Sequence, residues 1–452
     1  MKMFRIPARN ARHCRLDPHY HDALRTSYVH SHYPSAKLLS LSYFRTGGTP
    51  STAHPEYWNG SIPWVSAKDF KAFRFEDSED HVTELALAES TPCYVNRPAV
   101  LMVSRSGILQ HTLPVMVTHK PTTINQDIKA FFPDDRVTVD YLGAFFDVFG
   151  SRLLPLVCKS GATVQSLNTE QLMDLSIPLP PLQEQRKIVA ELDAAYAAKR
   201  AADEKAAKLL ASIDDMVLNE LGISKLPKPD TSLSSRIFTV PASEVVNGRL
   251  DPIAYQSMRR QFYKNVREGT YETLRLGEVV DVDRRQTDSL DGLTYVGLEN
   301  INGSDGTYSP TGAKESISTA VLFRKGEILF PKLRPYLNKV WLADFDGAAS
   351  TEFFPLIPNG TTPEYLVAYL RLTQVAKVMT LLMTGNTLPR VQLEDVLSLP
   401  VPIPPRPVQD RIASKASSIR VEARKLKADA TAALESAKQK IEEELIGEGE
   451  EG

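Results

Sequence analysis

The stretch Ile177-Pro178-Leu179-Pro180-Pro181-Leu182-Gln183-Glu184-Gln185-Arg186-Lys187-Ile188 decides how this chain is organised. It places two adjacent prolines directly before a long segment that is rich in charged residues and alanine. Proline is tolerated in the first turn of a helix but prevents the helix from extending backwards, and glycine suits the residue after a helix end. The sequence therefore predicts one long helix over residues 182–222, ending at Gly222.

Apolar residues recur every seven positions in this segment, which indicates a helix that packs along a seam against another helix. One column contains Ile188, Ala195, Ala202, Leu209 and Met216, and the other contains Leu192, Ala206 and Ile213, with Lys199 as an exception. A second such segment follows Pro404-Pro405, with columns of Ile412, Ile419, Leu426 and Ala433 and of Ala416, Ala423, Ala430 and Ala437. Because alanine lets two backbones approach closely, we expect the two helices to pack on each other in antiparallel fashion.

The rest of the chain also repeats once. The matching pairs are Phe4–Ala8 with Phe238–Ala242, Arg15–Pro18 with Arg249–Pro252, and Leu175–Pro180 with Leu397–Pro402. Phe131-Phe132-Pro133 and Phe353-Phe354-Pro355 each predict the end of a strand. A duplication with poorly matching interiors indicates two similar heads whose surface loops differ.

Each head is predicted to be mixed α/β (α+β), with many short strands and a pseudo-twofold internal repeat between the heads. Strand composition marks residues 99–103, 293–297 and 327–330, and short helices are expected over 141–149 and 363–372. The expected order is a first head over 1–181, a spacer helix over 182–222, a linker over 223–237, a second head over 238–403, a spacer helix over 404–447 and an acidic tail over 448–452.

Composition excludes several classes of protein. The chain has 452 residues, of which 42% are hydrophobic and 24% charged, so it is long enough for several ordinary globular domains. Its net charge is -2, so any nucleic-acid binding must use local patches. Three cysteines form no framework, and there is neither an apolar leader nor a membrane-spanning stretch. We therefore expect a cytoplasmic protein with no membrane contact.

Catalytic motifs are absent from the sequence. It contains no phosphate-binding G-x-x-x-x-G-K-[ST] loop, no G-x-G-x-x-G turn and no H-E-x-x-H pair, so we expect no metal or cofactor in this chain. Asp69-Phe70-Lys71 matches half of a metal-dependent nuclease site, which leaves a magnesium-dependent DNA nuclease as one alternative function. A coiled-coil scaffold for other proteins is a second alternative.

Loops rich in basic, amide and hydroxyl groups occur in both heads and are the candidate DNA-binding elements. Arginine and lysine donate to phosphates and to guanine, asparagine and glutamine pair with adenine, and threonine can contact the thymine methyl group. The candidates are Thr49, Ser51, Lys68, Arg105 and Ser106 in the first head, and Arg284, Arg285, Asn300, Lys332 and Arg334 in the second.

Taken together, these features resemble the specificity (S) subunit of type I restriction-modification systems over nearly the whole chain. The resemblance rests on the two heads, on Gly47–Ser51, on Pro55–Trp58 with Ile62–Val65, and most specifically on the helix entrance quoted above. The second helix entrance departs from this pattern at Pro407.

The resemblance implies a non-catalytic DNA-binding protein. Each head would be a target recognition domain that reads one half of a split, asymmetric site in double-stranded DNA, and the helices would fix the unread gap. Two modification subunits would use S-adenosylmethionine to methylate adenine, and restriction subunits would use ATP and magnesium to translocate and cleave DNA.

Overall fold

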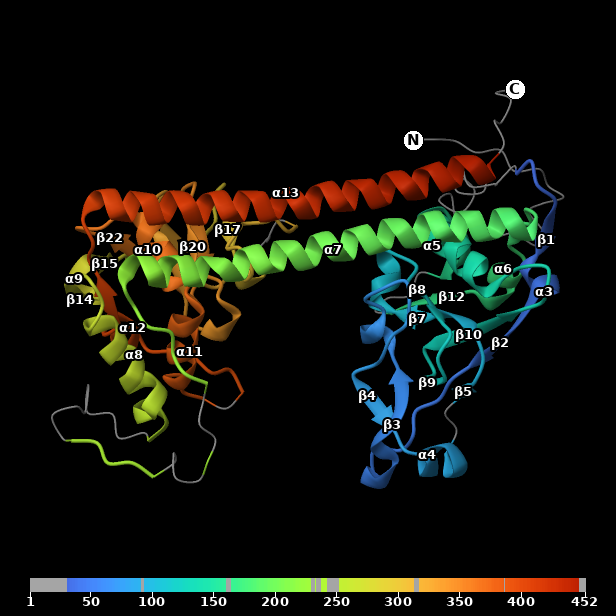
Figure 1. Cartoon of the computed structure of the whole chain (residues 1–452), viewed down its shortest axis with the longest axis horizontal. Helices are drawn as coiled ribbons and strands as arrows, with labels where there is room; N and C mark the ends of the chain where they lie inside the picture. Colours follow the sequence, from blue (N-terminus) through green and yellow to red (C-terminus); the bar gives the residue numbers. More distant parts are fainter. Residues whose placement is uncertain are drawn as a thin grey trace. The chain divides into compact units, whose positions relative to one another are not determined.

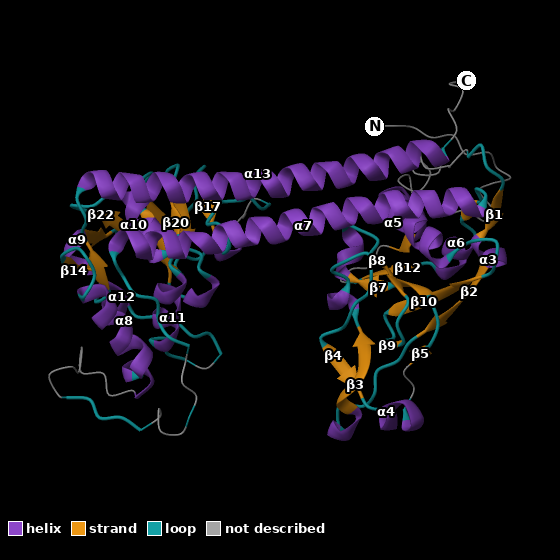
Figure 2. Cartoon of the chain, in the orientation of Figure 1, coloured by secondary structure: helices purple, strands orange, loops and turns teal. Residues whose placement is uncertain are grey.

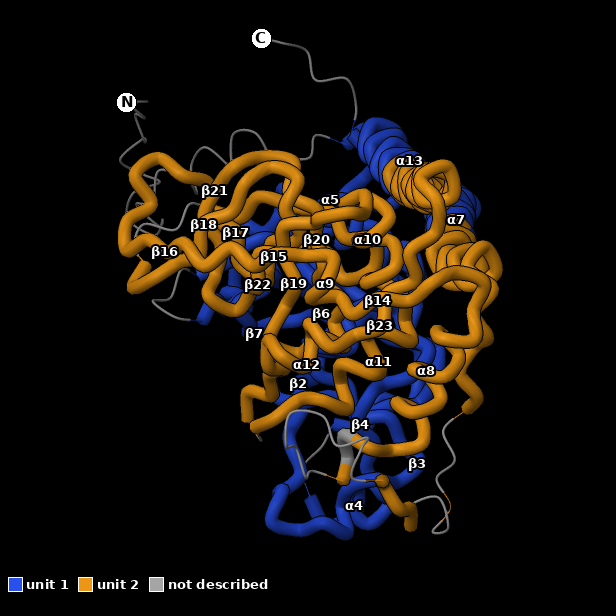
Figure 3. The backbone as a smooth tube through the Cα atoms, turned by 90° about the vertical axis from the view of Figure 1, so that its left-hand side faces the viewer, with its two compact units in different colours: residues 1–201, 429–452 blue, residues 202–428 orange. Residues whose placement is uncertain are grey.

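The computed structural model describes residues 31–90, 93–159, 164–228, 232, 237–241, 252–312, 317–385 and 387–446. The chain divides into two compact units (Figure 3), unit 1 with Met1–Ala201 and Asp429–Gly452, and unit 2 with Ala202–Ala428. The sequence matches at Phe4–Ala8 and Arg15–Pro18 and the predicted tail over 448–452 lie outside the described residues. No helix among the described residues is long and apolar enough to cross a membrane.

Both predicted long helices are present (Figures 1 and 2). Helix α7 spans Leu182–Leu221 and helix α13 spans Arg406–Leu445, and each has 40 residues. The first and last residues of α13 lie 224 positions after those of α7, so the helices correspond residue by residue.

Helix α7 ends at the predicted glycine. Gly222 has a φ of 65°, its N–H donates to the Asn219 carbonyl at 3.2 Å, and the Ile223 N–H donates to the Leu218 carbonyl at 2.9 Å. This pair of bonds is the Schellman arrangement, in which a left-handed residue closes the last turn. Ile223 is buried in the core of unit 2, so the predicted linker begins as packed chain.

The buried positions of α13 follow an 11-residue rather than a 7-residue period. Ala433, predicted in the seam, is exposed, and its neighbour Leu434 is buried instead. Ile412, Ala423, Leu434 and Leu445 are all buried and lie 11 positions apart. Three turns of 3.67 residues lie closer to the natural period of the α-helix than two turns of 3.5 residues. The heptad prediction is therefore correct only as far as Ala430.

The long helices pack antiparallel within each unit, as predicted. In unit 1 the first half of α7 and the second half of α13 share a core, and Lys440 pairs with Glu191 at 2.7 Å. In unit 2 the second half of α7 and the first half of α13 share a core, and Arg411 pairs with Glu220 at 2.7 Å. Each unit is thus completed by a segment from both helices.

Unit 1 contains two four-stranded sheets. One has the order β2 (Ser42–Thr46), β10 (Ile128–Pro133), β6 (Ala99–Val103) and β8 (Val115–Thr118). The other has the order β4 (Asp80–Val82), β3 (Trp58–Val65), β9 (Thr122–Ile124) and β5 (Cys93–Val95). Helix α5 (Val139–Val157) packs on the first sheet, and the alternating residues of β6 and β10 divide between a core under α5 and a core shared with the second sheet. The strand predicted over 99–103 is confirmed, and the helix predicted over 141–149 is longer.

Unit 2 repeats this plan. Its sheets have the orders β15 (Val280–Val282), β22 (Phe353–Pro358), β19 (Ile328–Pro331), β20 (Trp341–Leu342) and β16 (Gln286–Thr287), β18 (Ala320–Phe323), β21 (Gly347–Ser350), β17 (Tyr295–Val296). Helices α10 (Pro363–Leu370) and α11 (Thr373–Leu381) together correspond to α5, with the break at Arg371–Leu372. The other α-helices among the described residues are α3 (Leu38–Leu41), α4 (Glu84–Glu89), α6 (Thr169–Met173), α8 (Ser257–Arg267), α9 (Leu276–Val279) and α12 (Leu393–Leu397). Mixed α/β heads are therefore confirmed.

Two details of the predicted repeat are wrong in register. Pro133 at the end of β10 pairs with Ser42, and the equivalent pair in unit 2 is Pro358 with Val280. The counterpart of Pro133 is therefore Pro358, and Phe353 begins strand β22 instead of ending a strand. Likewise, Ser35 of β1 (Ser35–Lys37) pairs with Pro178 of β13 (Ser176–Pro178), whereas Thr273 of β14 (Thr273–Arg275) pairs with Pro402 of β23 (Pro400–Pro402). The proline motifs of the two halves align at one offset when residue types are compared and at another when hydrogen-bonded partners are compared. The two offsets differ because the same residue types recur two or three positions further along the chain.

A buried glutamine ties each long helix to the helix layer of its unit. The Gln185 side chain accepts from the Thr138 N–H at 2.9 Å and donates to the carbonyls of Arg136 and Pro180, each at 3.0 Å. The Gln409 side chain accepts from the Thr362 N–H at 2.9 Å and donates to the Pro404 carbonyl at 2.9 Å. The first turns of α7 and α13 are therefore fixed to the N-termini of α5 and α10 by the same contacts.

Candidate nucleic-acid interface

In unit 1, several candidate residues converge on the turn Asn125–Asp127, which joins β9 to β10. Ser104, at the end of β6, donates from its N–H to the Asp127 carbonyl at 2.7 Å and from its hydroxyl at 2.9 Å. On the other side, the Gly48 N–H donates to the Ile124 carbonyl at 3.1 Å. The turn is therefore held between the loop after β2 and the strand end before Arg105.

Glycine is required where the loop after β2 crosses this turn. A Cβ atom at Gly47 would lie 1.9 Å from the Ile124 carbonyl oxygen, which no side chain tolerates. The close approach places exposed Thr49 beside Gln126, and the Thr49 hydroxyl donates to the Gln126 amide oxygen. The turn thus displays a hydroxyl and an amide, groups that can read base edges.

Two unpaired cations flank the same region on a small sheet of β11 (Cys158–Lys159), β12 (Gln165–Leu167) and β7 (Arg105–Ser106). Ser166 pairs with Arg105 on one side and Lys159 on the other, so the three side chains lie on one face. Arg105 and Lys159 are exposed, and neither has an ion pair within the described parts of the chain. The Ser106 hydroxyl already has one hydrogen bond within the chain, because it accepts from the Ile108 N–H at 3.4 Å.

Unit 2 builds the equivalent turn from Thr351 and Glu352, between β21 and β22. The Lys332 N–H donates to the Glu352 carbonyl at 2.8 Å, as Ser104 does to Asp127, and the Val391 N–H donates to the Lys332 carbonyl at 3.0 Å, as Leu167 does to Ser104. The backbone frame is therefore the same in both units. Lys332 stands in the place of Ser104, and by the same count Arg334 stands in that of Ser106.

The side chains at this turn differ from those in unit 1. Arg390, equivalent to Ser166, holds the Glu352 carboxylate in a fork, with Nε and a terminal nitrogen at 2.9 and 2.6 Å. Arg334 is exposed and has a left-handed φ of 48° just before Pro335. Lys332 lies over the Phe354 ring at 4.5 Å, and burial lowers the pKa of its amine. Arg334 is therefore the exposed cation beside this turn, whereas Arg390 is half-buried and partly neutralised by Glu352.

Several predicted residues are engaged elsewhere. Lys68 pairs with Glu79 and Asp80 at 3.2 and 2.8 Å, and Arg285 pairs with Asp283. The Ser51 hydroxyl accepts from the Ala53 N–H at 3.3 Å and stays exposed. Arg284 is exposed, and no ion pair involving it occurs in the part of the chain that the structure describes. Lys68 and Arg285 are therefore partly neutralised, whereas Arg284 is available.

Asn300 and Asp69 occupy equivalent capping positions. Asn300 is 2% exposed, and its amide oxygen accepts from the Gly297 N–H at 2.7 Å. Asp69 is 8% exposed and accepts from the Ser66 N–H at 2.8 Å in the same way. Both side chains are held inside their loops, so Asn300 is less accessible than the other predicted residues.

Nothing in the described part of the chain supports the nuclease alternative. The other oxygen of Asp69 accepts from the Glu79 N–H at 3.0 Å, and Lys71 pairs with Glu79 at 2.6 Å. Across the described residues, no group of three or more His, Cys, Asp or Glu side chains could hold a metal ion. Asp69 is thus explained by loop structure.

Sequence reasoning missed Gln126, Lys159 and Arg390. Each reaches the site only through strand pairing or through the turn. A signal existed for Arg390, since it follows the echoed glycine motif at the position where the first half has Ser166. The predicted residues Thr49, Arg105 and Ser106 are brought together in unit 1, and Lys332 and Arg334 are brought together in unit 2.

Comparison with known proteins gives relatives of one kind. The sequence family described as the type I restriction modification DNA specificity domain matches residues 35–209 and 268–435. The EcoR124I/EcoR124II specificity subunit of Escherichia coli is 38% identical over 148 residues, which cover 32% of this chain and 37% of that protein. The MjaIX specificity subunit of Methanocaldococcus jannaschii is 30% identical over 162 residues, which cover 34% of this chain and 36% of that protein. The matched parts thus span little more than a third of each relative.

Among solved structures, one from work on complex assembly and conformational transition of the type I R-M system aligns with a TM-score of 0.47 and 14% identity. The alignment covers 91% of this chain and 96% of that chain. The two segments that match the sequence family make up most of the chain. The chain therefore belongs to the family of the type I restriction modification DNA specificity domain.

Proposed function

We propose that this chain is the sequence-reading, non-catalytic specificity subunit of a type I restriction-modification complex. Each unit would contact one half of a split site in double-stranded DNA through its turn, Asn125–Asp127 or Thr351–Glu352. The two long helices would set the length of the unread gap.

The observation that carries this proposal is that the two units share the same backbone hydrogen bonds at the turn but present different side chains there. Unit 1 presents Thr49, Gln126 and Arg105, whereas unit 2 presents Arg334 and Arg390 at the equivalent turn. Base edges are distinguished by the pattern of donors and acceptors that face them. Two different patterns on one frame are suited to two different half-sites.

The proposed partners supply the chemistry. Two modification subunits would bind S-adenosylmethionine and methylate adenine, and restriction subunits would bind ATP and magnesium. Because the net charge of this chain is -2, we expect weak DNA binding by the chain alone, with basic partners providing many of the salt-sensitive phosphate contacts.

Mapping of methylated adenine across the genome tests the proposal. Cells that carry the system with and without this chain should differ by one split, asymmetric methylation motif, which disappears on deletion. Reintroduction of the Arg390→Ala variant should change the bases preferred in one half of that motif only. An unchanged methylation map on deletion would refute the proposal.

A further inference from the structure

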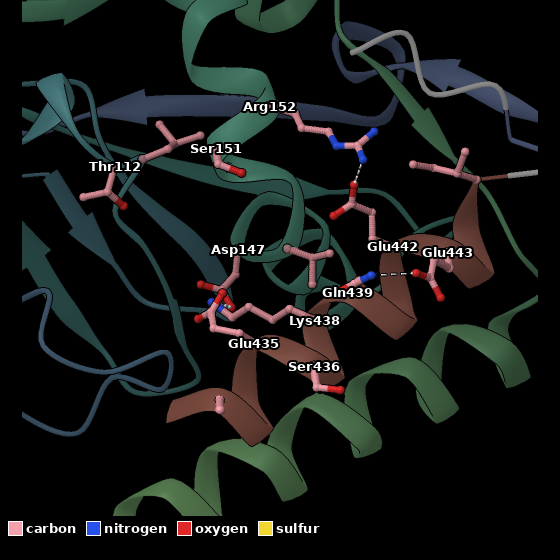
Figure 4. Close-up of a pocket in the computed structure, with 15 residues that line it drawn as sticks. Thr112, Asp147, Ser151, Arg152, Glu435, Ser436, Lys438, Gln439, Glu442 and Glu443 are labelled. Atoms are coloured by element: carbon pink, nitrogen blue, oxygen red, sulfur yellow. Dashed lines mark hydrogen bonds and ion pairs between the residues drawn. The ribbon is translucent and has the colours of Figure 1, made fainter. Parts of the chain in front are cut away.

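In unit 1, Asp147 of α5, Tyr196 of α7 and Lys438 of α13 meet in one poorly exposed cluster. The Lys438 amine lies 3.0 Å from the Asp147 carboxylate, and the two side chains are 18% and 16% exposed. The Tyr196 hydroxyl donates to the same carboxylate at 2.8 Å, and the amine lies 5.4 Å from the centre of the Tyr196 ring. Figure 4 shows Lys438 of α13 and Asp147 of α5 directed toward one another.

The corresponding positions in unit 2 carry reversed charges. At the same 224-residue offset, Asp147 becomes Arg371, Tyr196 becomes Arg420, and Lys438 corresponds to Asp214 of α7. This offset holds at both ends of the long helices, and it also relates Val139 and Val157 of α5 to the start of α10 and the end of α11. The acidic and basic residues are therefore exchanged between these positions, although among the described residues Arg371 and Asp214 form no ion pair and Arg420 adds a second positive charge.

Arg371 is fixed where α10 ends. It is 6% exposed, and its guanidinium donates to the carbonyls of Asn338, Val340 and Gly303 at 2.7, 2.9 and 2.8 Å. Burial and the Arg420 charge lower the pKa of Arg371, to about 9, and the charges of Asp305 and, to a smaller extent, Asp214 oppose that shift. Asp214 itself accepts from the Thr373 N–H at 3.0 Å, in the first turn of α11.

A second pair of positions differs in the same sense. In unit 1, Arg152 of α5 forms an ion pair with Glu442 of α13, whose side chain is 18% exposed. At the corresponding positions unit 2 has Ala376 of α11 and Leu218 of α7, and Leu218 is buried in the unit 2 core. One unit is thus closed by a salt bridge where the other has apolar residues.

These differences oppose an exchange between the second halves of the two helices. If the second half of α7 took the place of that of α13 in unit 1, Asp214 would face Asp147 and Arg152 would lose its partner. In the converse exchange, Lys438 would face Arg371, and Glu442 would enter an apolar core. Like charges beside the poorly exposed Asp147 and an unpaired Glu442 in an apolar core are costly. Arg152 is 44% exposed, so the loss of its partner would add little.

We infer that the charge-reversed positions assign the end of each long helix to one unit, and that they oppose pairing between equivalent halves of two copies of this chain. The two long helices could otherwise compete for the same place in a unit, since both have 40 residues and correspond residue by residue. The inference concerns how the chain pairs with itself and does not depend on what the heads bind.

Charge reversal in the full chain tests the cluster in unit 1. Lys438→Asp should lower the melting temperature of unit 1 by on the order of 5 to 10 °C, because it places two carboxylates together. Adding Asp147→Lys should recover most of that loss. Lys425→Asp makes the same charge change at an exposed position of α13 in unit 2 and should leave the melting temperature of unit 1 unchanged. Equal melting temperatures for Lys438→Asp and Lys425→Asp, or no recovery in the double variant, would overturn the inference.

The pairing itself is tested by Asp214→Lys combined with Lys438→Asp, which leaves the net charge unchanged. In this variant the second half of α7 carries the charge that suits unit 1, and the second half of α13 carries the charge that suits unit 2. The charges are therefore complementary only when two copies of the chain exchange these halves. Size-exclusion chromatography with light scattering should show a larger dimer fraction than for the wild type at equal concentration, together with a lower melting temperature. A variant that has the wild-type mass distribution, whether or not its melting temperature falls, would exclude the assignment of helix ends by charge.

Discussion

Arg105 and Arg334 are exposed cations beside equivalent turns in different units. On the proposed function, Arg105→Ala should weaken recognition of one half-site roughly 10- to 100-fold and leave the other half unchanged, because a good contact between a side chain and a base contributes about 1–3 kcal/mol. Arg334→Ala should have the reciprocal effect.

Binding of the assembled methyltransferase to duplexes with single half-site changes measures this. Arg267→Ala, on the exposed face of α8, serves as a control of the same residue type. Equal weakening of both half-sites by either variant would contradict the assignment of one unit to one half-site.

Gln185 joins three backbone groups that no other part of α7 reaches. Gln185→Leu keeps the approximate shape but leaves the Thr138 N–H and two carbonyls without partners, so we expect a loss of about 1–3 kcal/mol in the free energy of unfolding. Urea unfolding measures the loss, and the exposed Gln183→Leu is the matched control. A stability equal to that of the control would show that water replaces the glutamine at no cost.

For single residues, the residue type and its neighbours in the sequence predicted exposure to solvent better than they predicted a role in DNA reading. Thr49, Arg105 and Arg334 were placed correctly in loops or strand ends because glycine and proline mark such positions. The burial of Asn300 was not predicted, because its partner, the Gly297 N–H, becomes available only once the loop has closed. Pairing of this kind depends on tertiary contacts, which composition and spacing do not contain.

Among the helices, α13 provides a test of the 11-residue period. Ala423 is 1% exposed, so Ala423→Leu should destabilise the protein by about 1–3 kcal/mol through overpacking. Ala433 is exposed, so Ala433→Leu should be nearly neutral, although a heptad places both residues in the seam. Thermal unfolding of the two variants distinguishes the periods, and equal destabilisation would restore the heptad.

The contact between α7 and α13 in unit 2 predicts a pH dependence. Hydrogen bonds from Arg411 and Lys415 lower the pKa of Glu220 from 4.5 to about 2. A lowered folded-state pKa stabilises the protein above the unfolded-state value, and that contribution is lost as the pH falls from about 4.5 to about 2. The stability difference between the wild type and Glu220→Gln, about 1 kcal/mol at neutral pH, should therefore vanish over this range. A difference that stays constant in acid unfolding experiments would exclude this cause.

Helix existence and boundaries were predictable because proline and glycine mark them, as at Pro181 and Gly222. Which residues of α13 form the buried seam was not predictable, because the many alanines allow several different apolar stripes along the helix. Leu434 decides between them, because a buried leucine contributes more than the neighbouring alanine. The helix predicted over 363–372 agrees with α10, whereas the following helix α11 was not predicted.

For the whole chain, the composition of unit 1 predicts the effect of truncation. Its core includes Leu434, Ile441 and Leu445. A chain ending at Ala428 loses all three, and each such loss from a core costs about 2–5 kcal/mol. Limited proteolysis with mass spectrometry should then show rapid cleavage within 31–201 and continued protection of 252–428. Protection of both regions would mean that unit 1 is stable without the second half of α13.

The duplication was predictable for the whole chain, but the way the chain closes each unit was not. Sequence order suggests a head followed by its own helix, whereas each compact unit takes a segment from both long helices. That arrangement depends on the antiparallel pairing of distant segments. Short motifs cannot report such pairing.

This closure has a consequence for synthesis on the ribosome. Residues 202–428 form a continuous unit, but unit 1 takes its last segment from Asp429 onward. At about 5–20 residues per second, roughly 10 to 45 seconds separate translation of Ala201 from that of Asp429. For that interval, the part of unit 1 already made lacks the apolar side chains of Leu434, Ile441 and Leu445, so the core residues that contact them stay exposed. It is then an expected client for chaperones, and its maturation waits for a segment made more than two hundred codons later.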